Sequence, residues 1–186
     1  TVFWAYSYVP ATVAVAGITM WDFTAAGIIR RSGEDLSNWM RSDKERPSLH
    51  FSPPRNWMND PNGLSKISDT WHVFYQFHPC GNDWGPAHWG HATSKDLFNW
   101  LHLPVFLSPE QELWRLGATG GAFSGSAFEY RDGKRMFFYT ERLPAYDLFT
   151  GYREVQMLAI PGRDTITAEA TTLLLEERPK GVYHDF

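Results

Sequence analysis

From Arg46-Pro47 onward, short aromatic and β-branched runs alternate with turn residues, and we find no amphipathic helical period. The dipeptides Asp132-Gly133 and Pro161-Gly162, and the tetrapeptide Asp60–Gly63, are strong turn signals between such runs. Many short strands at near-regular spacing are typical of a sandwich, a barrel or a propeller, and the spacing does not choose among them. The expected strands are Gly63–Ile67, Trp71–His78, His88–Ser94, Asn99–Pro104, Phe123–Tyr130, Lys134–Thr140, Glu154–Ile160 and Ala170–Leu175.

The composition agrees with a β-rich domain and argues against a nucleic-acid partner. Nine Trp, eight Tyr and thirteen Phe make 16% of the 186 residues, and aromatic side chains favour strands while offering flat faces to sugar rings. The net charge is −4 and no Lys/Arg run exceeds Arg30-Arg31, so we expect no nucleic-acid partner. Cys80 is the single cysteine, so no disulfide can form within the chain.

Residues 1–45 differ from the rest and are expected to form a separate β-rich N-terminal segment of unknown role. The first 29 residues carry one charge, Asp22, but they contain no Leu and are interrupted by Pro10. They also lack a basic start and a cleavage site, which argues against a signal peptide or a membrane span. The alternating β-branched residues within 11–20 favour a buried strand instead. We therefore expect no membrane partner. The location is unknown, and the absence of an internal disulfide slightly favours the cytoplasm over secretion.

The densest segment spans residues 51–63 and contains Asp60-Pro61-Asn62-Gly63. Asp, Pro and Gly at the first, second and fourth positions suit a type I turn. Pro61 fixes its own φ and disfavours the helical conformation for Asp60, so the carboxylate would sit on a stiff, extended backbone. A catalytic nucleophile needs such fixed placement. An isolated Asp-Pro-Asn-Gly is nevertheless more often an ordinary turn, in which the Asp side chain bonds its own backbone.

The blocks around Asp60 include residues 57–63 (Trp-Met-Asn-Asp-Pro-Asn-Gly) and residues 46–51 (Arg-Pro-Ser-Leu-His-Phe). They resemble glycoside hydrolase family 32, which includes invertases, inulinases and sucrose-6-phosphate hydrolases. Residues 57–63 match that family's signature at every position, and residues 46–51 are similar to its opening. The resemblance covers about residues 46–186, which we expect to form part of the catalytic domain. Four further blocks follow in the family's order: Phe74-Tyr75-Gln76, Trp84-Gly85, His88-Trp89-Gly90-His91-Ala92 and Phe123-Ser124-Gly125-Ser126.

The resemblance implies a role for each matching residue. Asp60 corresponds to the nucleophile that forms a covalent fructosyl-enzyme. A fructosyl sugar is the implied partner, and no cofactor or metal is implied. His88 and His91 have an H-x-x-H spacing, but their strand pattern favours packing over metal binding. Six residues correspond to groups that contact the sugar, either as polar partners or as aromatic walls: Asn59, Gln76, Ser124, Trp57, Trp84 and Phe123.

The family fold is a five-bladed β-propeller followed by a β-sandwich, so eight strands imply about two of the five blades. The family's acid/base is the Glu of a Glu-Cys pair, and an Arg-Asp-Pro block supplies a third carboxylate. Neither block occurs in these 186 residues. We therefore expect the acid/base to lie outside this chain, and the chain alone to be inactive. Glu129, Glu141 and Asp185 are available carboxyl groups, but none sits in a matching block.

The predicted function is hydrolysis of a terminal β-D-fructofuranosyl bond, as in sucrose or fructans, by retaining double displacement. A fructosyltransferase of the same fold is one alternative, and its acceptor-site residues would lie beyond this chain. A non-catalytic carbohydrate-binding fragment is a second alternative, which the missing acid/base favours. A related five-bladed family that acts on arabinans is a third, and the full block at residues 57–63 argues against it.

Overall fold

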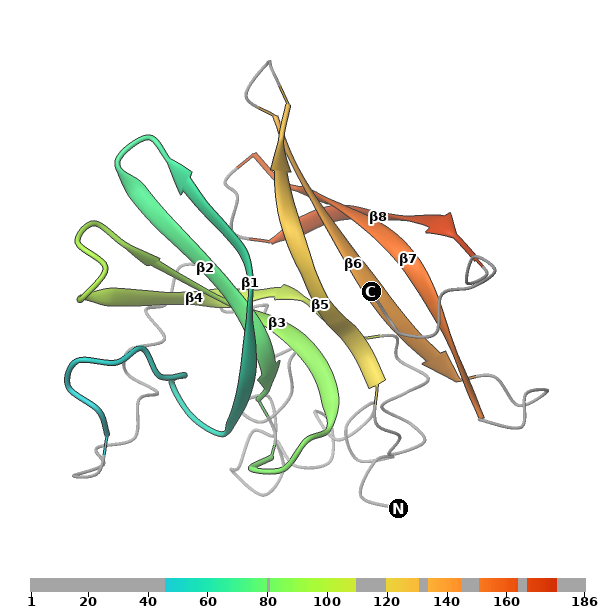
Figure 1. The fold of residues 1–186 in the computed structure, drawn as a ribbon, viewed down its shortest axis with the longest axis horizontal. Helices are drawn as coiled ribbons and strands as arrows, with labels where there is room; N and C mark the ends of the chain where they lie inside the picture. The colour runs from blue at the N-terminus through green and yellow to red at the C-terminus, as the bar shows by residue number, and fades with distance from the viewer. Residues whose placement is uncertain are drawn as a thin grey trace, which may run out of the picture.

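The computed structural model describes residues 46–79, 81–109, 120–130, 134–144, 151–163 and 167–176 (Figure 1). These residues form an all-β structure, as expected from the sequence. Its strands are β1 (Trp57–Ile67), β2 (Thr70–His78), β3 (Pro86–Ser94), β4 (Trp100–Leu107), β5 (Gly120–Glu129), β6 (Arg135–Pro144), β7 (Tyr152–Pro161) and β8 (Ala168–Leu175).

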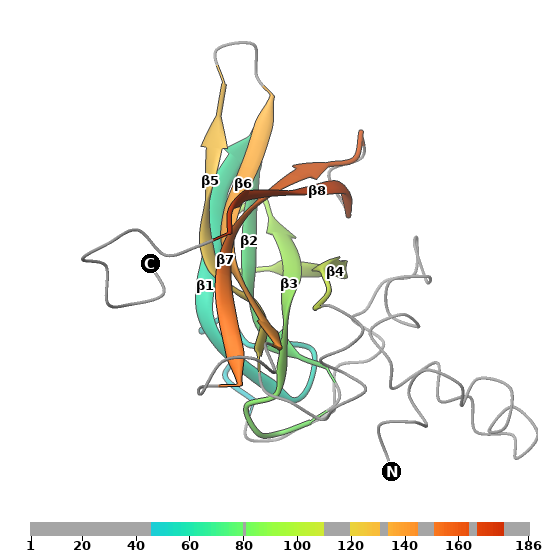
Figure 2. The ribbon, with the colours of Figure 1, turned by 90° about the vertical axis from the view of Figure 1, so that its right-hand side faces the viewer.

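Two antiparallel meanders make up the sheet. The first joins β1 through β4 in chain order, and the second joins β5 through β8. A short parallel contact between β3 and β5 connects them, where Pro86 pairs with Gly120 and Ala87 with Gly121. β4 pairs with β3 further along, at Trp89–Ser94, so β3 contacts three strands. Figures 1 and 2 show β1 and β5, the first strands of the two meanders, lying next to each other.

Aromatic side chains from both meanders meet in one core. Phe74 of β2 and Phe106 of β4 each lie with their ring centroids 4.8 Å from that of Phe137 on β6. Trp89 of β3 is fully buried in the same cluster and lies edge-to-face with Tyr139 of β6. Burying such large apolar rings is a main source of folding free energy, so this shared core fixes one meander against the other. The high aromatic content therefore serves packing as well as any sugar contact.

Each expected strand is present, and the observed strands mostly begin earlier or end later than predicted. The prediction of a type I turn at Asp60–Gly63 is wrong, because these residues lie inside β1. Register shifts between Met58 and Pro61 and between Asn62 and Ser65 keep the strand paired to β2 through this segment. Such β-bulges let a strand accommodate proline and a glycine at positive φ, here Gly63 at 51°.

Some expectations fall on residues that the structure does not describe. The N-terminal segment 1–45, Cys80, Asp185 and the Asp132-Gly133 turn all lie outside the described residues. The Pro161-Gly162 turn lies where β7 ends, and the Gly162 amide donates to the Thr167 carbonyl at 2.9 Å. In the described parts of the chain, no helix has the length and apolar character needed to cross a membrane.

Candidate active site

Asp60 lies in the bulged part of β1 with an exposed side chain. Its Oδ2 accepts a hydrogen bond of 2.7 Å from the hydroxyl of Ser124, which is 64 residues away on β5. A hydroxyl donor orients a carboxylate while leaving its second oxygen available. The fold thus brings together two of the residues that the family resemblance singled out, one from each meander.

Asn62 forms a second connection between β1 and β5, and the sequence analysis did not identify it. Its side chain is 2% exposed, and its Oδ1 accepts a hydrogen bond of 3.3 Å from the Gly125 amide. Gly63 follows directly, and a Cβ at that position would lie 3.0 Å from the Phe74 ring. The segment that carries Asp60 is therefore held by a hydrogen bond on one side and by the aromatic core on the other.

Gln76 lies beneath the first residues of β5, at 3% exposure. Its Nε2 donates to the Ala122 carbonyl at 2.8 Å, and the Trp89 Nε1 donates to the Phe123 carbonyl at the same distance. These bonds hold the β5 backbone next to Ser124 in place. Gln76 was expected to bind the sugar; one of its two amide hydrogens is used by the Ala122 carbonyl, so its second N–H and its Oε1 are the groups that could meet a hydroxyl group.

Trp57 and Asn59 lie at the start of β1 and contact each other. The Trp57 Nε1 donates to the Asn59 Oδ1 at 2.8 Å, and both side chains are half-buried. The Trp57 amide also donates to the Gly81 carbonyl at 3.0 Å, and the Asn56 side chain donates to the Pro79 carbonyl. These contacts tie the start of β1 to the loop between β2 and β3.

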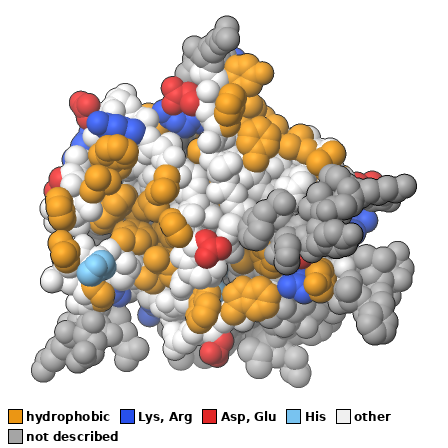
Figure 3. All heavy atoms as spheres, in the orientation of Figure 1, with side chains coloured by type: hydrophobic (Ala, Val, Ile, Leu, Met, Phe, Trp, Pro, Cys, Tyr) orange, Lys and Arg blue, Asp and Glu red, His pale blue; other side chains and the backbone are white. Residues whose placement is uncertain are grey.

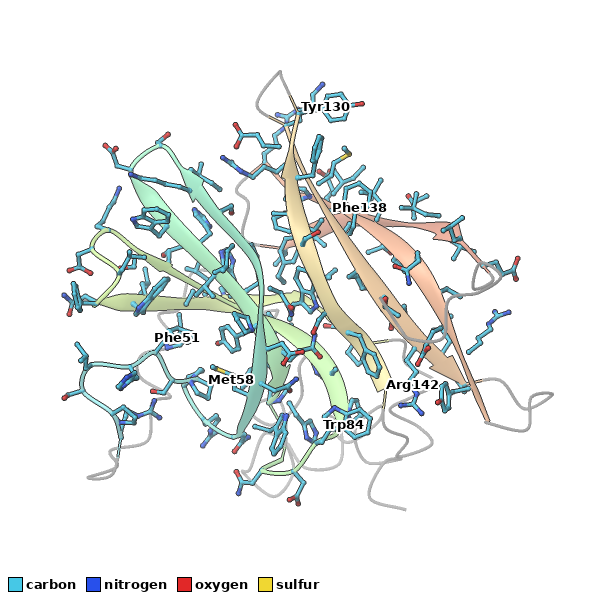
Figure 4. The ribbon with its side chains drawn as sticks, viewed as in Figure 1. Phe51, Met58, Trp84, Tyr130, Phe138 and Arg142 are labelled. Atoms are coloured by element: carbon cyan, nitrogen blue, oxygen red, sulfur yellow. The ribbon has the colours of Figure 1, made fainter. Side chains whose placement is uncertain are left out.

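Trp84 is on that loop and is 42% exposed. Its ring centroid lies 6.1 Å from that of Phe123, so the two expected aromatic walls face one region. The guanidinium carbon of Arg142 lies 5.9 Å from the Trp84 centroid and 5.8 Å from that of Phe123, and 3.3 Å from the centroid of Tyr152. Figure 4 shows Trp84 and Arg142 at the same end of the molecule, where β5 begins and β6 ends. Arg142 and Tyr152 were not predicted, because neither lies in a motif.

His88 and His91 lie in β3, and side chains three positions apart along a strand point to opposite faces. His88 is buried, and its Nδ1 lies 2.8 Å from the Pro86 carbonyl. Burial lowers the pKa of His88 to about 3, against a smaller opposing effect of the hydrogen bond to Pro86. His91 shares a hydrogen bond of 3.0 Å with His72, whose pKa is lowered by burial and by the Arg135 charge. Among the described residues, no group of three His, Cys, Asp or Glu side chains is placed to hold a metal ion.

The described carboxyl groups other than Asp60 include two that the sequence analysis considered as acids. Glu129 is exposed and forms an ion pair of 2.7 Å with Arg135. Glu141 is buried at 4% exposure and lies opposite Ala122 in the pairing of β5 with β6.

Comparison with protein families finds one match that covers most of the chain. The model for the N-terminal domain of glycosyl hydrolases family 32 matches residues 50–186. A levanase of Bacillus subtilis is 46% identical over 59% of this chain, and an Escherichia coli sucrose-6-phosphate hydrolase is 43% identical over 74%. The chain spans only 15% and 28%, respectively, of the length of these two curated relatives.

Comparison with solved structures also finds enzymes of family 32. A family 32 glycoside hydrolase from Bifidobacterium adolescentis superposes with a TM-score of 0.62 at 30% identity, over 86% of this chain and 25% of that protein. The Bombyx mori β-fructofuranosidase BmSUC1 superposes with a TM-score of 0.59 at 35% identity, over 82% of this chain and 30% of that protein. The fold therefore matches a part of each of these two family 32 proteins.

Proposed function

The chain belongs to glycosyl hydrolase family 32, and from that premise we propose that it supplies the nucleophile and part of the sugar pocket for cleaving terminal β-D-fructofuranosyl bonds. The observation that carries the proposal is the placement of Asp60, exposed on a bulged strand and hydrogen-bonded by Ser124. A nucleophile must be both reachable and fixed, and this carboxylate meets both conditions.

The proposed reaction is a double displacement with retention. Asp60 attacks the anomeric carbon of the fructosyl unit, while an acid protonates the departing glycosidic oxygen, so the bond to the leaving sugar breaks as the ester bond to Asp60 forms. The conjugate base of that acid then takes a proton from water, and the hydroxyl oxygen replaces Asp60 at the anomeric carbon. The acid in this proposal comes from outside the chain, because neither Glu-Cys nor Arg-Asp-Pro occurs in the sequence.

The proposed sugar pocket lies around Asp60 and uses Asn59, Trp57 and Ser124, together with Trp84, Phe123 and Gln76. Indole and phenyl faces suit the C–H face of a sugar ring, while amide and hydroxyl groups suit its hydroxyls. The Bombyx mori relative has been solved in complex with sucrose, and a fructan 1-exohydrolase of Cichorium intybus has been solved with 1-kestose. Both ligands carry a fructosyl unit, which supports the substrate class proposed here.

We also propose that the two meanders are two adjacent blades of a five-bladed propeller. Asp60 and Ser124 lie on β1 and β5, the first strands of the two meanders. In a propeller the blades surround a central channel. Residues on neighbouring first strands would then line that channel together, and the hydrogen bond between Asp60 and Ser124 supports this arrangement.

The test is kinetic, in a polypeptide that extends this chain to the length of its curated relatives. Asp60→Asn should lower kcat for sucrose by at least about three orders of magnitude, because an amide is not a nucleophile. Ser124→Ala should lower kcat/KM about tenfold, because it removes the donor that orients the carboxylate. Circular dichroism should show both variants folded.

Ser126→Ala is the matched control for the hydroxyl, since Ser126 lies two residues further along β5 and is exposed. It should leave kcat/KM within about twofold of the parent. Activity of Asp60→Asn within about tenfold of the parent would remove Asp60 as nucleophile. A folded, sugar-binding parent without hydrolysis would favour the non-catalytic alternative.

A further inference from the structure

Trp89 of β3 contacts β5 at two points, one on each side of Ser124. Its Nε1 donates to the Phe123 carbonyl at 2.8 Å, and a Cβ on Gly125 would lie 2.9 Å from its Cζ2. Ser124 lies between these two residues, and its hydroxyl bonds the Asp60 carboxylate. The indole of Trp89 therefore holds the backbone before and after the residue that orients the candidate nucleophile.

The backbone of β5 lacks regular pairing where Trp89 meets it. The register shift of β5 against β6 falls at Phe123 and Ser124, and the parallel pairing of β5 with β3 ends at Gly121. A bulge disrupts the hydrogen-bond ladder of a strand, so side chains must supply the contacts that fix its backbone. The hydrogen bond from Trp89 is such a contact, since it joins β3 to β5 beyond their last paired residues.

Trp89 has no surface with which to touch a sugar. Its side chain is 0% exposed and is packed in the aromatic core that the two meanders share. Gln76 also bonds this stretch of β5, through the Ala122 carbonyl, but Gln76 was expected to contact the sugar as well. The sequence analysis assigned no role to Trp89, and the proposed reaction does not use it. Any effect of Trp89 on catalysis would therefore pass through β5.

We propose that Trp89 is a positioning residue that sets the Ser124 hydroxyl on the Asp60 carboxylate. The inference rests on the proposed function, because it takes Asp60 as the nucleophile. The indole N–H fixes the carbonyl that precedes Ser124, and the ring fixes the residue that follows it. A small displacement of a reacting group lowers the rate strongly, so loss of this support should lower kcat while the groups that bind the sugar stay in place.

Replacing the indole N–H alone tests the proposal in the extended polypeptide. Benzothienylalanine has the shape of tryptophan, with a sulfur atom where the indole has its N–H. In place of Trp89, it should lower kcat for sucrose about fivefold and leave KM within about twofold of the parent. Circular dichroism should show the fold of the parent. Trp89→Phe removes the same donor together with part of a buried ring, so only the isosteric replacement separates the hydrogen bond from packing.

Trp100 provides the matched control. Its Nε1 donates to the Leu97 carbonyl at 3.1 Å, in the hairpin between β3 and β4. The same replacement at Trp100 thus removes a hydrogen bond of the same kind that makes no contact with β5. It should leave both kcat and KM within about twofold of the parent. An equal loss of kcat from the two replacements would overturn the proposal, because it would reflect a general weakening of the structure.

A double-mutant cycle with Ser124→Ala shows whether Trp89 acts through the Ser124 hydroxyl. In the Ser124→Ala background, replacing Trp89 should change kcat by less than about twofold, because no hydroxyl remains to be positioned. A fivefold loss that persists in this background would overturn the positioning role. An unchanged kcat when Trp89 alone is replaced would overturn it as well.

Asp60→Asn, measured in parallel, separates this inference from the proposed function. If hydrolysis depends on Asp60 but either of those results is found, the positioning role of Trp89 is wrong and the function stands. If hydrolysis by the parent does not depend on Asp60, the proposed function is wrong, and the inference that rests on it is wrong too.

Discussion

At the scale of single residues, the hydroxyl of Ser124 lies where it can orient the carboxylate of Asp60. The sequence analysis assigned Ser124 to the sugar, whereas in the structure its hydroxyl donates to the Asp60 carboxylate. A serine hydroxyl can still accept a hydrogen bond from a sugar, so both roles are compatible. Ser124 is thus a positioning residue in the proposed site, and its sugar contact stays a prediction.

Buried histidine gives a second prediction at this scale. Burial lowers the pKa of His88 from 6.5 to about 3, so the folded state keeps His88 neutral where the unfolded chain would be protonated. The free energy of unfolding should therefore be highest above pH 6.5 and fall as the pH drops from 6.5 toward 3. The slope from this one group approaches about 1.4 kcal/mol per pH unit. Urea unfolding at a series of pH values measures this dependence of the free energy of unfolding on pH.

The comparison of variants isolates His88 from other titrating groups. His88→Asn should lower the free energy of unfolding at neutral pH but make it less steeply dependent on pH. His50→Asn is the control, since His50 is exposed, and it should keep the pH dependence of the parent. If His88→Asn and the parent had the same slope, the protonation of His88 would not be coupled to unfolding.

At the scale of elements, the bulges of β1 and β5 create the candidate site. β5 shifts its register against β6 between Ala122 and Gly125, and β1 shifts against β2 around Asp60 and Asn62. A hydrogen bond from the Gly125 amide to the Asn62 side chain joins the two irregular segments. Bulges redirect side chains out of the regular alternation, which explains how residues of two strands converge on one carboxylate.

Gly125 should be intolerant of any side chain. A Cβ there would overlap the Phe138 carbonyl oxygen and would lie 2.8 Å from the Tyr139 Cα and 2.9 Å from the Trp89 ring. Because two of these contacts are with backbone atoms, the strands must separate to relieve them. We expect Gly125→Ala to lower the free energy of unfolding by about 3 kcal/mol or more. Thermal and urea unfolding measure the change.

Gly151 provides the control for this substitution. It has a φ of 74°, and a Cβ there would meet no atom within 4 Å. Gly151→Ala should therefore cost only the conformational strain of a left-handed residue, about 1 kcal/mol. Equal losses for the two variants would mean that the close packing of β5 against β6 does not govern stability.

At the scale of the whole molecule, many large hydrophobic side chains of the described residues are exposed to solvent. Figure 3 shows hydrophobic side chains over both meanders, and Leu173, Leu174 and Leu175 on β8 are each about half exposed. β8 pairs with β7 on one side, and no strand among the described residues pairs with its other edge. Open edges and apolar patches promote association, so we expect the 186-residue chain to self-associate in solution.

The 186 residues alone should not hydrolyse sucrose at an enzyme-like rate. General acid assistance is worth about 10²–10⁴-fold, and the sequence holds no block that matches the family's acid/base. The measurement compares fructose release by soluble parent chain with release by the same chain carrying Asp60→Asn. Equal, near-background rates are expected. Robust release that depends on Asp60 would mean that a carboxyl group within the chain, such as Glu141 or Asp185, serves as the acid.

The sequence by itself determined the strands and the family membership, whereas the roles of the site residues stay predictions. Short aromatic and β-branched runs bounded by turn residues are a local signal, so the eight strands could be located without knowing their partners. The block around Asp60 likewise lies in one contiguous segment, which makes family membership readable from the chain alone.

Only the tertiary structure decided which side chains contact each other across the sheet. Ser124 reaches Asp60, and Gln76 reaches the Ala122 carbonyl, across separations of 64 and 46 residues. The turn predicted at Asp60–Gly63 became a bulged strand because pairing with β2 overrode the local preference of Asp-Pro-Asn-Gly. The cluster around Arg142 has no sequence signal, since its rings come from separate strands and a loop. Register and bulges are set by contacts between distant segments, and a local pattern carries no information about them.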